Sequence, residues 1–262
     1  MVTEFFTRGW AKFGPDPRVL DWAAHALPAA RAAVRDPKLA HWHVCEGTWF
    51  VGVDALPNDE TGRIGASAAL CGPAVDFIET HIGPLPPLHP AQLSVIWPGY
   101  PRPREGESDA AFRYRQRRDA AHLDGLKAEG PDRRRHIAEP HGFILGLPLS
   151  ECAPGAAPMV VWEGSHEILR AALTGALADH DPKDWGRVDV TEPYQVARKR
   201  VFETCRRVPL QARPGESYLL HRLSLHGVAP WEEGTGAAQE GRMIAYFRPL
   251  MPGGAEEWLR AP

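Results

Sequence analysis

The sequence predicts a mainly β protein, in which helices flank a barrel or a two-sheet sandwich of short strands. From about Gln92 onward, segments rich in β-branched and aromatic residues follow one another, each bounded by Gly or Pro. The chain also contains 25 Gly and 26 Pro among its 262 residues, which indicates many turns between short elements. The expected strands lie within residues 92–100, 111–122, 141–149, 157–166, 216–227 and 241–250.

The first ninety residues predict mostly helices. Asp16 and Pro17 are typical of an N-cap and a first helical turn, and a helical pattern continues to about residue 34. Pro28 interrupts this pattern, so one helix or two short ones are expected. Residues 43–56 predict a strand or hairpin, and residues 72–82, 167–180 and 193–208 predict further helices. We therefore expect one domain over residues 1–262, with a mostly helical portion at 1–90 and a β core at 91–250.

Composition excludes several classes of protein. A formal net charge of −3 gives no reason to expect a nucleic-acid or anionic-membrane partner. The four cysteines are scattered without a C-x-x-C pair, which argues against a disulfide scaffold or a zinc finger. No apolar stretch has the length of a signal peptide core or a membrane span, so a cytoplasmic location is expected.

The short motif His122-Leu123-Asp124 can supply two metal ligands. On an extended chain, residues i and i+2 project from the same face, so the imidazole and the carboxylate can converge on one point. Together they are two thirds of a 2-His-1-carboxylate triad, which leaves several positions on iron open for substrate and oxygen.

A second histidine is expected from residues 216–227, which are predicted as one strand. Alternation would place His226 on a face with polar groups and His221 on the opposite face among leucines. This favours His226 as the third ligand, although a bulge near Gly227 would exchange the two histidines.

Arg242 opens the last predicted strand and shares one face of it with Arg248. An arginine that faces a barrel interior is costly unless it is paired with an anion. Its planar guanidinium is suited to a carboxylate, such as the far end of a dicarboxylate cosubstrate. Arg248 is the alternative anchor.

The order of His-x-Asp, a distal His-Gly and an Arg on the next strand resembles the phytanoyl-CoA dioxygenase family. The segments Trp162–His166 and Pro214–Glu216 are similar to that family's turns after a core strand and before the distal histidine. The resemblance extends over roughly residues 90 to 250.

This resemblance implies a double-stranded β-helix, the jelly-roll or cupin-like barrel, and an Fe(II)- and 2-oxoglutarate-dependent dioxygenase. It further implies that His122, Asp124 and His226 bind the metal and carry the chemistry, that Arg242 binds 2-oxoglutarate, and that O2 and a small molecule are the other substrates. Because related halogenases lack the carboxylate, Asp124 favours hydroxylation.

Two alternatives stay open. His41 and His43, followed by Glu46, resemble half of a cupin metal motif, which would place the metal elsewhere in a similar barrel. The chain could also be a non-catalytic β-helix protein that binds a small ligand.

Overall fold

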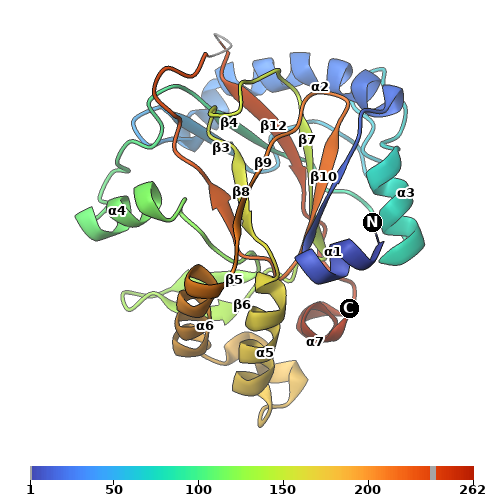
Figure 1. Ribbon diagram of the computed structural model, residues 1–262. Helices are drawn as coiled ribbons and strands as arrows, with labels where there is room; N and C mark the ends of the chain where they lie inside the picture. Colours follow the sequence, from blue (N-terminus) through green and yellow to red (C-terminus); the bar gives the residue numbers. More distant parts are fainter. Residues whose placement is uncertain (1, 237–239) are drawn as a thin grey trace.

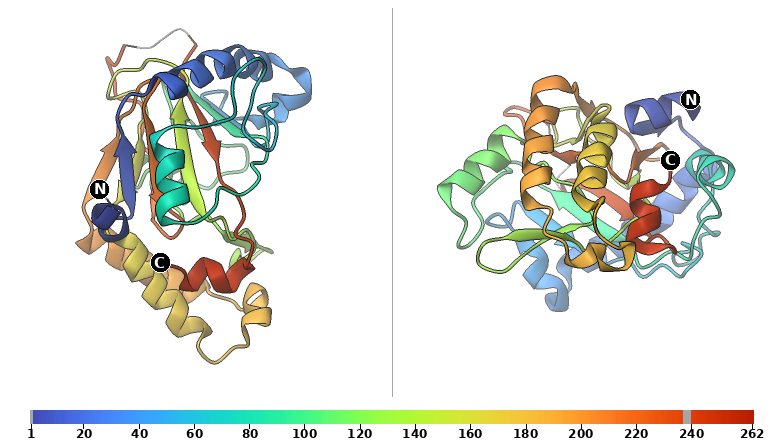
Figure 2. Two further views of the ribbon diagram at one scale, coloured as in Figure 1. Left: turned by 90° about the vertical axis from the view of Figure 1, so that its right-hand side faces the viewer. Right: turned by 90° about the horizontal axis from the view of Figure 1, so that it is seen from below.

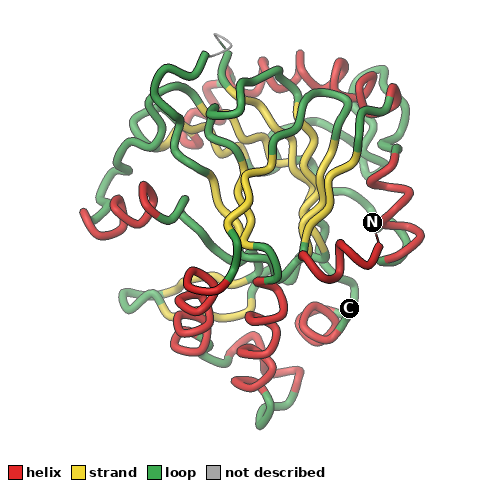
Figure 3. Tube along the Cα trace, viewed as in Figure 1, coloured by secondary structure: helices red, strands yellow, loops and turns green. Residues whose placement is uncertain are grey.

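The computed structural model describes residues 2–236 and 240–262, which form two antiparallel sheets that face each other (Figure 1, Figure 3). The larger sheet has seven strands in the order β1-β10-β7-β12-β4-β3-β2, and the smaller has three in the order β11-β8-β9. A two-stranded hairpin, β5-β6, lies below them.

The larger sheet consists of β1 (Trp10–Phe13), β10 (Ser217–His221), β7 (Phe143–Pro148), β12 (Arg242–Phe247), β4 (Gln92–Ile96), β3 (Trp49–Gly52) and β2 (His43–Val44). The smaller sheet consists of β11 (His226–Val228), β8 (Met159–Trp162) and β9 (Arg207–Leu210), and the hairpin of β5 (Leu126–Glu129) and β6 (Arg134–Ile137). The α-helices are α1 (Val2–Arg8), α2 (Pro17–Arg35), α3 (Pro73–His81), α4 (Asp109–Arg117), α5 (Ser165–Leu177), α6 (Thr191–Thr204) and α7 (Gly254–Arg260). Two short 3-10 helices span Pro37–Trp42 and Pro182–Arg187.

Both faces of the large sheet are buried. On β12, Met243, Ala245 and Phe247 pack outward in one cluster with residues of α2 and α3, while Ile244 and Tyr246 face the smaller sheet. Figure 2 shows the helices that cover the outer face. Because each side of these strands meets an apolar layer, the sequence there reads as a nearly continuous apolar run and not as an alternation of polar and apolar residues.

Gly146 makes room for two tyrosines inside the barrel. It pairs with Tyr218 on β10 and with Tyr246 on β12, so the three residues lie side by side across the sheet. The tyrosine hydroxyls meet at 2.8 Å. A Cβ on Gly146 would overlap the ring of Tyr218, so a side chain at this position is incompatible with the pair.

Two predicted strands are wrong or incomplete. Residues 111–122, predicted as a strand, instead contain most of α4. This helix begins where the Ser108 hydroxyl accepts a hydrogen bond from the Ala111 N–H at 3.3 Å. The Ala, Arg and Gln residues that follow are good helix formers, and they outweigh the aromatic residues between them.

The predicted strand over residues 216–227 is broken. β10 ends at His221 in the large sheet, and β11 begins at His226 in the small one. Between them the chain turns, with the Ser224 N–H bonded to the His221 carbonyl at 2.9 Å. The alternation used to choose between the two histidines therefore does not apply, although it selected the residue that faces the candidate metal site.

The first ninety residues contribute strands as well as helices. β1 was not predicted, yet it pairs along its length with β10. The expected hairpin forms as β2 and β3, and β3 continues the sheet next to β4. Pro28 lies inside a single helix, α2. Within the described residues, no helix is both long and apolar enough to cross a membrane.

We expect Gly146→Ala to lower the free energy of unfolding by about 1–3 kcal/mol, because the added methyl forces Tyr218 off its position. Urea denaturation followed by circular dichroism measures this. Gly175→Ala in α5 is the matched control. A Cβ there meets nothing within 4 Å, and alanine is more stable than glycine inside a helix, so this variant should lose no stability. Equal losses in the two variants would contradict the packing role of Gly146.

Candidate metal centre

His122 and His226 are held opposite each other by their backbones. The His122 N–H donates to the His226 carbonyl at 2.8 Å, and the His226 N–H donates to the His122 carbonyl at 3.1 Å. The loop that carries His122 is fixed by Asp119, whose carboxylate binds the Arg207 guanidinium at 2.7 and 2.9 Å. Gly227 follows His226 because a Cβ there would collide with the Asp119 carbonyl.

Hydrogen bonds orient both imidazoles in the same way. Nδ1 of His122 lies 3.0 Å from the Ala120 carbonyl, and Nδ1 of His226 lies 3.0 Å from the Ser224 carbonyl. A carbonyl can only accept, so each Nδ1 carries the proton in the neutral ring. Nε2 of each ring is then an unprotonated lone pair, which is the form that binds a metal.

Asp124 completes the group. Its Oδ1 lies 3.4 Å from Nε2 of His122 and 3.8 Å from Nε2 of His226, and the three ligand atoms lie within 4.8 Å of one another. Burial alone would raise the pKa of Asp124, but the adjacent His122 and His226 rings and the Arg248 guanidinium hold it well below its usual value. Burial lowers the pKa of His226 to about 4, with the neighbouring His122 adding to the effect. The site therefore offers one carboxylate and a neutral imidazole at neutral pH.

The three residues line a cavity of about 240 Å³ between the two sheets. Its walls are largely apolar, and the polar side chains in them bond to one another: Trp49 Nε1 donates to the Ser94 hydroxyl at 3.0 Å. The His122 side chain is 48% exposed whereas that of His226 is 4% exposed, so the site meets solvent on the His122 side. The cavity is lined by Trp49, Val51, Val53, Gln92, Ser94, Ile144, Met159, Gly227, Val228, Tyr246 and Arg248 beside the three candidate ligands.

Arg248 is paired with other groups of the protein. Its Nη1 lies 3.1 Å from Oδ2 of Asp124, and its Nη2 donates to Oε1 of Gln92 at 2.5 Å. The sequence suggested Arg248 as the alternative cosubstrate anchor, but these bonds engage both ends of its guanidinium. Sequence reasoning missed this pair, and the only available signal was that Arg248 shares a strand face with Arg242.

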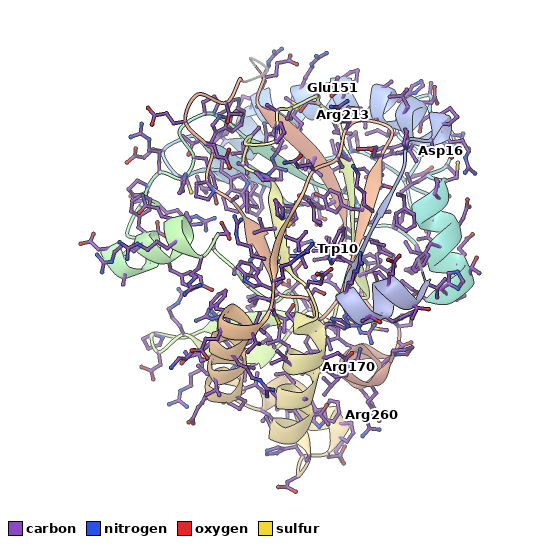
Figure 4. All side chains as sticks on the ribbon, in the orientation of Figure 1. Trp10, Asp16, Glu151, Arg170, Arg213 and Arg260 are labelled. Carbon is purple, nitrogen blue, oxygen red and sulfur yellow. The ribbon has the colours of Figure 1, made fainter. Side chains whose placement is uncertain are left out.

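Arg242 lines a second cavity, of about 310 Å³, and does not line the one at the metal centre. Its side chain is buried, and all three guanidinium nitrogens lack a hydrogen-bond partner. Arg213 on the rim of this cavity lies near Glu151 at the top of the molecule in Figure 4. The inner face of β12 contributes to both cavities, since Ile244 lines the second and Tyr246 lines the one at the metal centre.

The other histidines considered from the sequence lie elsewhere. Nδ1 of His221 accepts the Leu223 N–H at 3.0 Å, and its Nε2 lies 3.0 Å from Arg170, which extends from α5 in Figure 4. His43 bonds to the Val34 carbonyl and stacks on Trp97. In the part of the chain that the structure describes, His122, Asp124 and His226 are the only group of three or more potential ligands, so nothing there supports the cupin alternative.

The fold matches proteins of known structure. EctD from S. alaskensis with bound Fe superposes with a TM-score of 0.50 at 17% sequence identity, covering 94% of this chain and 74% of that one. This chain and EctD therefore share a fold. The double-stranded β-helix expected from the sequence is therefore confirmed, in a mixed arrangement of helices and antiparallel sheets.

Two further structures are similar at lower scores. EctD with 2-oxoglutarate and 5-hydroxyectoine gives a TM-score of 0.48 at 18% identity, with 100% of this chain and 82% of that one covered. SnoK, a non-haem α-ketoglutarate-dependent carbocyclase from nogalamycin biosynthesis, gives 0.42 at 14% identity over 98% and 87% of the two chains. No family model and no curated protein matches the sequence.

We expect the metal-free protein to lose stability as the pH falls from 6.5 toward 4. Burial lowers the pKa of His226 from its ordinary value of 6.5 to about 4, so in this pH range the unfolded chain takes up a proton that the folded one excludes. The free energy of unfolding is unaffected by this group above pH 6.5, and the loss between pH 6.5 and 4 is at most about 3 kcal/mol. Urea denaturation at pH 7.5 and pH 5.0 measures the difference.

His226→Asn should reduce this pH dependence, because asparagine does not titrate and the unfolded variant takes up no proton at this position. His41 is exposed, so His41→Asn is the control and should leave the pH dependence of stability unchanged. An equal pH dependence in wild type and His226→Asn would show that His226 is not buried in its neutral form.

Proposed function

We propose that this chain is an Fe(II)- and 2-oxoglutarate-dependent dioxygenase that hydroxylates a small molecule. The observation that carries the proposal is the convergence of two imidazole Nε2 atoms and one carboxylate oxygen, each imidazole being oriented by a bond from its other nitrogen. Two histidines and one carboxylate are the ligand set of non-haem iron oxygenases.

The residues fit the metal in their chemistry. Asp124 is a carboxylate, and His226 is neutral, so neither has to lose a proton at neutral pH before it binds a cation. When bound, Fe(II) together with 2-oxoglutarate would supply the activation of O2 that oxidises a C–H bond. His122, Asp124 and His226 would hold the ion, and the apolar walls around them would limit the access of water to the reacting atoms.

Arg242 is proposed to bind the distal carboxylate of 2-oxoglutarate. A buried guanidinium without any hydrogen-bond partner is costly, and an anion that forks onto it would remove that cost. Tyr246 lies four residues after Arg242 on the inner face of β12 and lines the cavity of the triad, and its hydroxyl bonds to that of Tyr218. Arg248 is already paired, which leaves Arg242 as the arginine of this strand that lacks a partner.

The cavity at the candidate metal centre favours a small substrate. Its walls are mostly apolar, and the Trp49 indole and the Gln92 amide oxygen are already bonded within the protein. The presence of Asp124 where related halogenases have a small residue supports hydroxylation.

The first test is the conversion of 2-oxoglutarate to succinate with added Fe(II) and O2, together with Fe(II) binding. Asp124→Ala should lose both activity and metal affinity, because it removes the only carboxylate of the described ligand group. His43→Ala is the matched control and should retain both. Loss of iron in His43→Ala with retention in His122→Ala would instead favour the cupin alternative.

Metal affinity that is intact without oxygen consumption over a broad panel of substrates would indicate a non-catalytic binding protein.

Arg242→Leu should raise the KM for 2-oxoglutarate at least tenfold while Fe(II) affinity stays within about twofold of wild type, since the side chain is remote from the metal ligands. Arg242→Lys should retain part of the affinity because it keeps the charge but loses the fork. Isothermal titration of 2-oxoglutarate into the metal-loaded protein checks this. An unchanged KM in Arg242→Leu would rule out the assignment.

A further inference from the structure

Arg248 holds the oxygen of Asp124 that does not face the two histidines. Oδ1 of Asp124 lies toward both imidazole Nε2 atoms, at 3.4 and 3.8 Å, whereas Oδ2 lies 3.1 Å from Nη1 of Arg248. The two carboxylate oxygens therefore have different neighbours. One is directed at the candidate metal position and the other is engaged by a cation.

We propose that Arg248 is a positioning residue that restricts Asp124 to binding the metal through one oxygen. The inference rests on the proposed metal site and adds a role that the ligand set alone does not define. A carboxylate can bind a cation through one or both oxygens. With Oδ2 engaged by Arg248, the second mode would break a charge-assisted hydrogen bond in a partly buried site.

The consequence concerns the open positions on the metal. Three protein ligands leave about three positions of an octahedral ion free, and a dicarboxylate cosubstrate and O2 together need all of them. A carboxylate bound through both oxygens would occupy one of these positions. By holding Oδ2, Arg248 keeps that position available.

Arg248 is itself fixed from a neighbouring strand. Its Nη2 donates to Oε1 of Gln92 at 2.5 Å, and Gln92 belongs to β4, which pairs with β12. Its backbone N–H lies 3.3 Å from Nε2 of His89. The Arg248 side chain is 19% exposed and that of Asp124 is 10% exposed, so solvent competes little for either group. The guanidinium thus bridges Gln92 and Asp124 as a rigid fork.

The matched comparison is a second Arg–carboxylate pair among the described residues in which both side chains are mostly buried. Arg115 Nη2 lies 2.5 Å from Oε1 of Glu107, with side chains 10% and 7% exposed, and neither residue lines the cavity at the metal centre. A variant of Arg115 therefore reports the general cost of breaking a buried ion pair. A variant of Arg248 reports that cost together with any effect on the metal.

The test uses Co(II) as a spectroscopic probe in the full chain, by titration and by its visible absorption. Arg248→Leu should weaken Co(II) binding about 10–100-fold and alter the absorption bands, as expected for the loss of a group that orients a metal ligand. Arg115→Leu should keep the wild-type affinity and spectrum. Co(II) affinity of Arg248→Leu within twofold of wild type, or tighter, with an unaltered spectrum, would overturn the proposal.

Two further variants keep the test decisive if Arg248→Leu folds poorly. Arg248→Lys keeps the charge but cannot bridge both partners, so its affinity should lie between those of wild type and Arg248→Leu. Gln92→Leu should weaken Co(II) binding less, and should have no added effect in the Arg248→Lys background, because Gln92 acts through the guanidinium. If the effects of Gln92→Leu and Arg248→Lys on Co(II) affinity were fully additive, Gln92 would not act through the Arg248 guanidinium.

The outcome is separable from failure of the proposed function. If Asp124→Ala retains the wild-type Co(II) spectrum, the metal centre itself is wrong. If Asp124→Ala loses Co(II) and Arg248→Leu does not, the metal centre stands and only the role of Arg248 is rejected.

Discussion

The passage of the chain from the large sheet to the small one, between His221 and His226, is the constraint on which the rest of the site depends. It is held by buried hydrogen bonds: the Ser224 hydroxyl donates to the Gly9 carbonyl at 2.8 Å, and the Leu225 N–H donates to the Ser165 hydroxyl at 2.9 Å. These bonds tie β1 and α5 to the crossing. Because β11 begins directly after it, His226 is delivered to the smaller sheet opposite the loop of His122.

Much of the fold could be predicted because its buried strands are short apolar runs between turn residues, as at residues 143–148 and 242–247. The failures have different origins, one in a contact distant along the chain and one in local contacts. β1 becomes a strand only because the edge of β10 accepts it, and the segment around Tyr114 is helical because a cap and a buried Arg115–Glu107 pair outweigh its aromatic content. Local pattern carries no information on the partner of β1, whereas the Ser108 cap is a local signal that the aromatic residues outweighed in the prediction.

The three candidate ligands were predictable because their residue types are restrictive and two of them are adjacent in sequence. The neighbours of those ligands were not, since Arg248 meets Asp124, and Gln92 meets Arg248, only after three separate segments converge. His226, and not His221, lies in the candidate ligand group, but the alternation that favoured it assumed a strand that the structure breaks. The separation of Arg242 into a second cavity also required three-dimensional information.

The two histidines differ in exposure, so the candidate metal centre is open to solvent on one side only. The His226 side chain is almost fully buried, whereas nearly half of the His122 side chain is exposed to solvent. An ion held here would face solvent on the His122 side, with His226 on its buried side. A chelator would therefore reach such an ion from the His122 side.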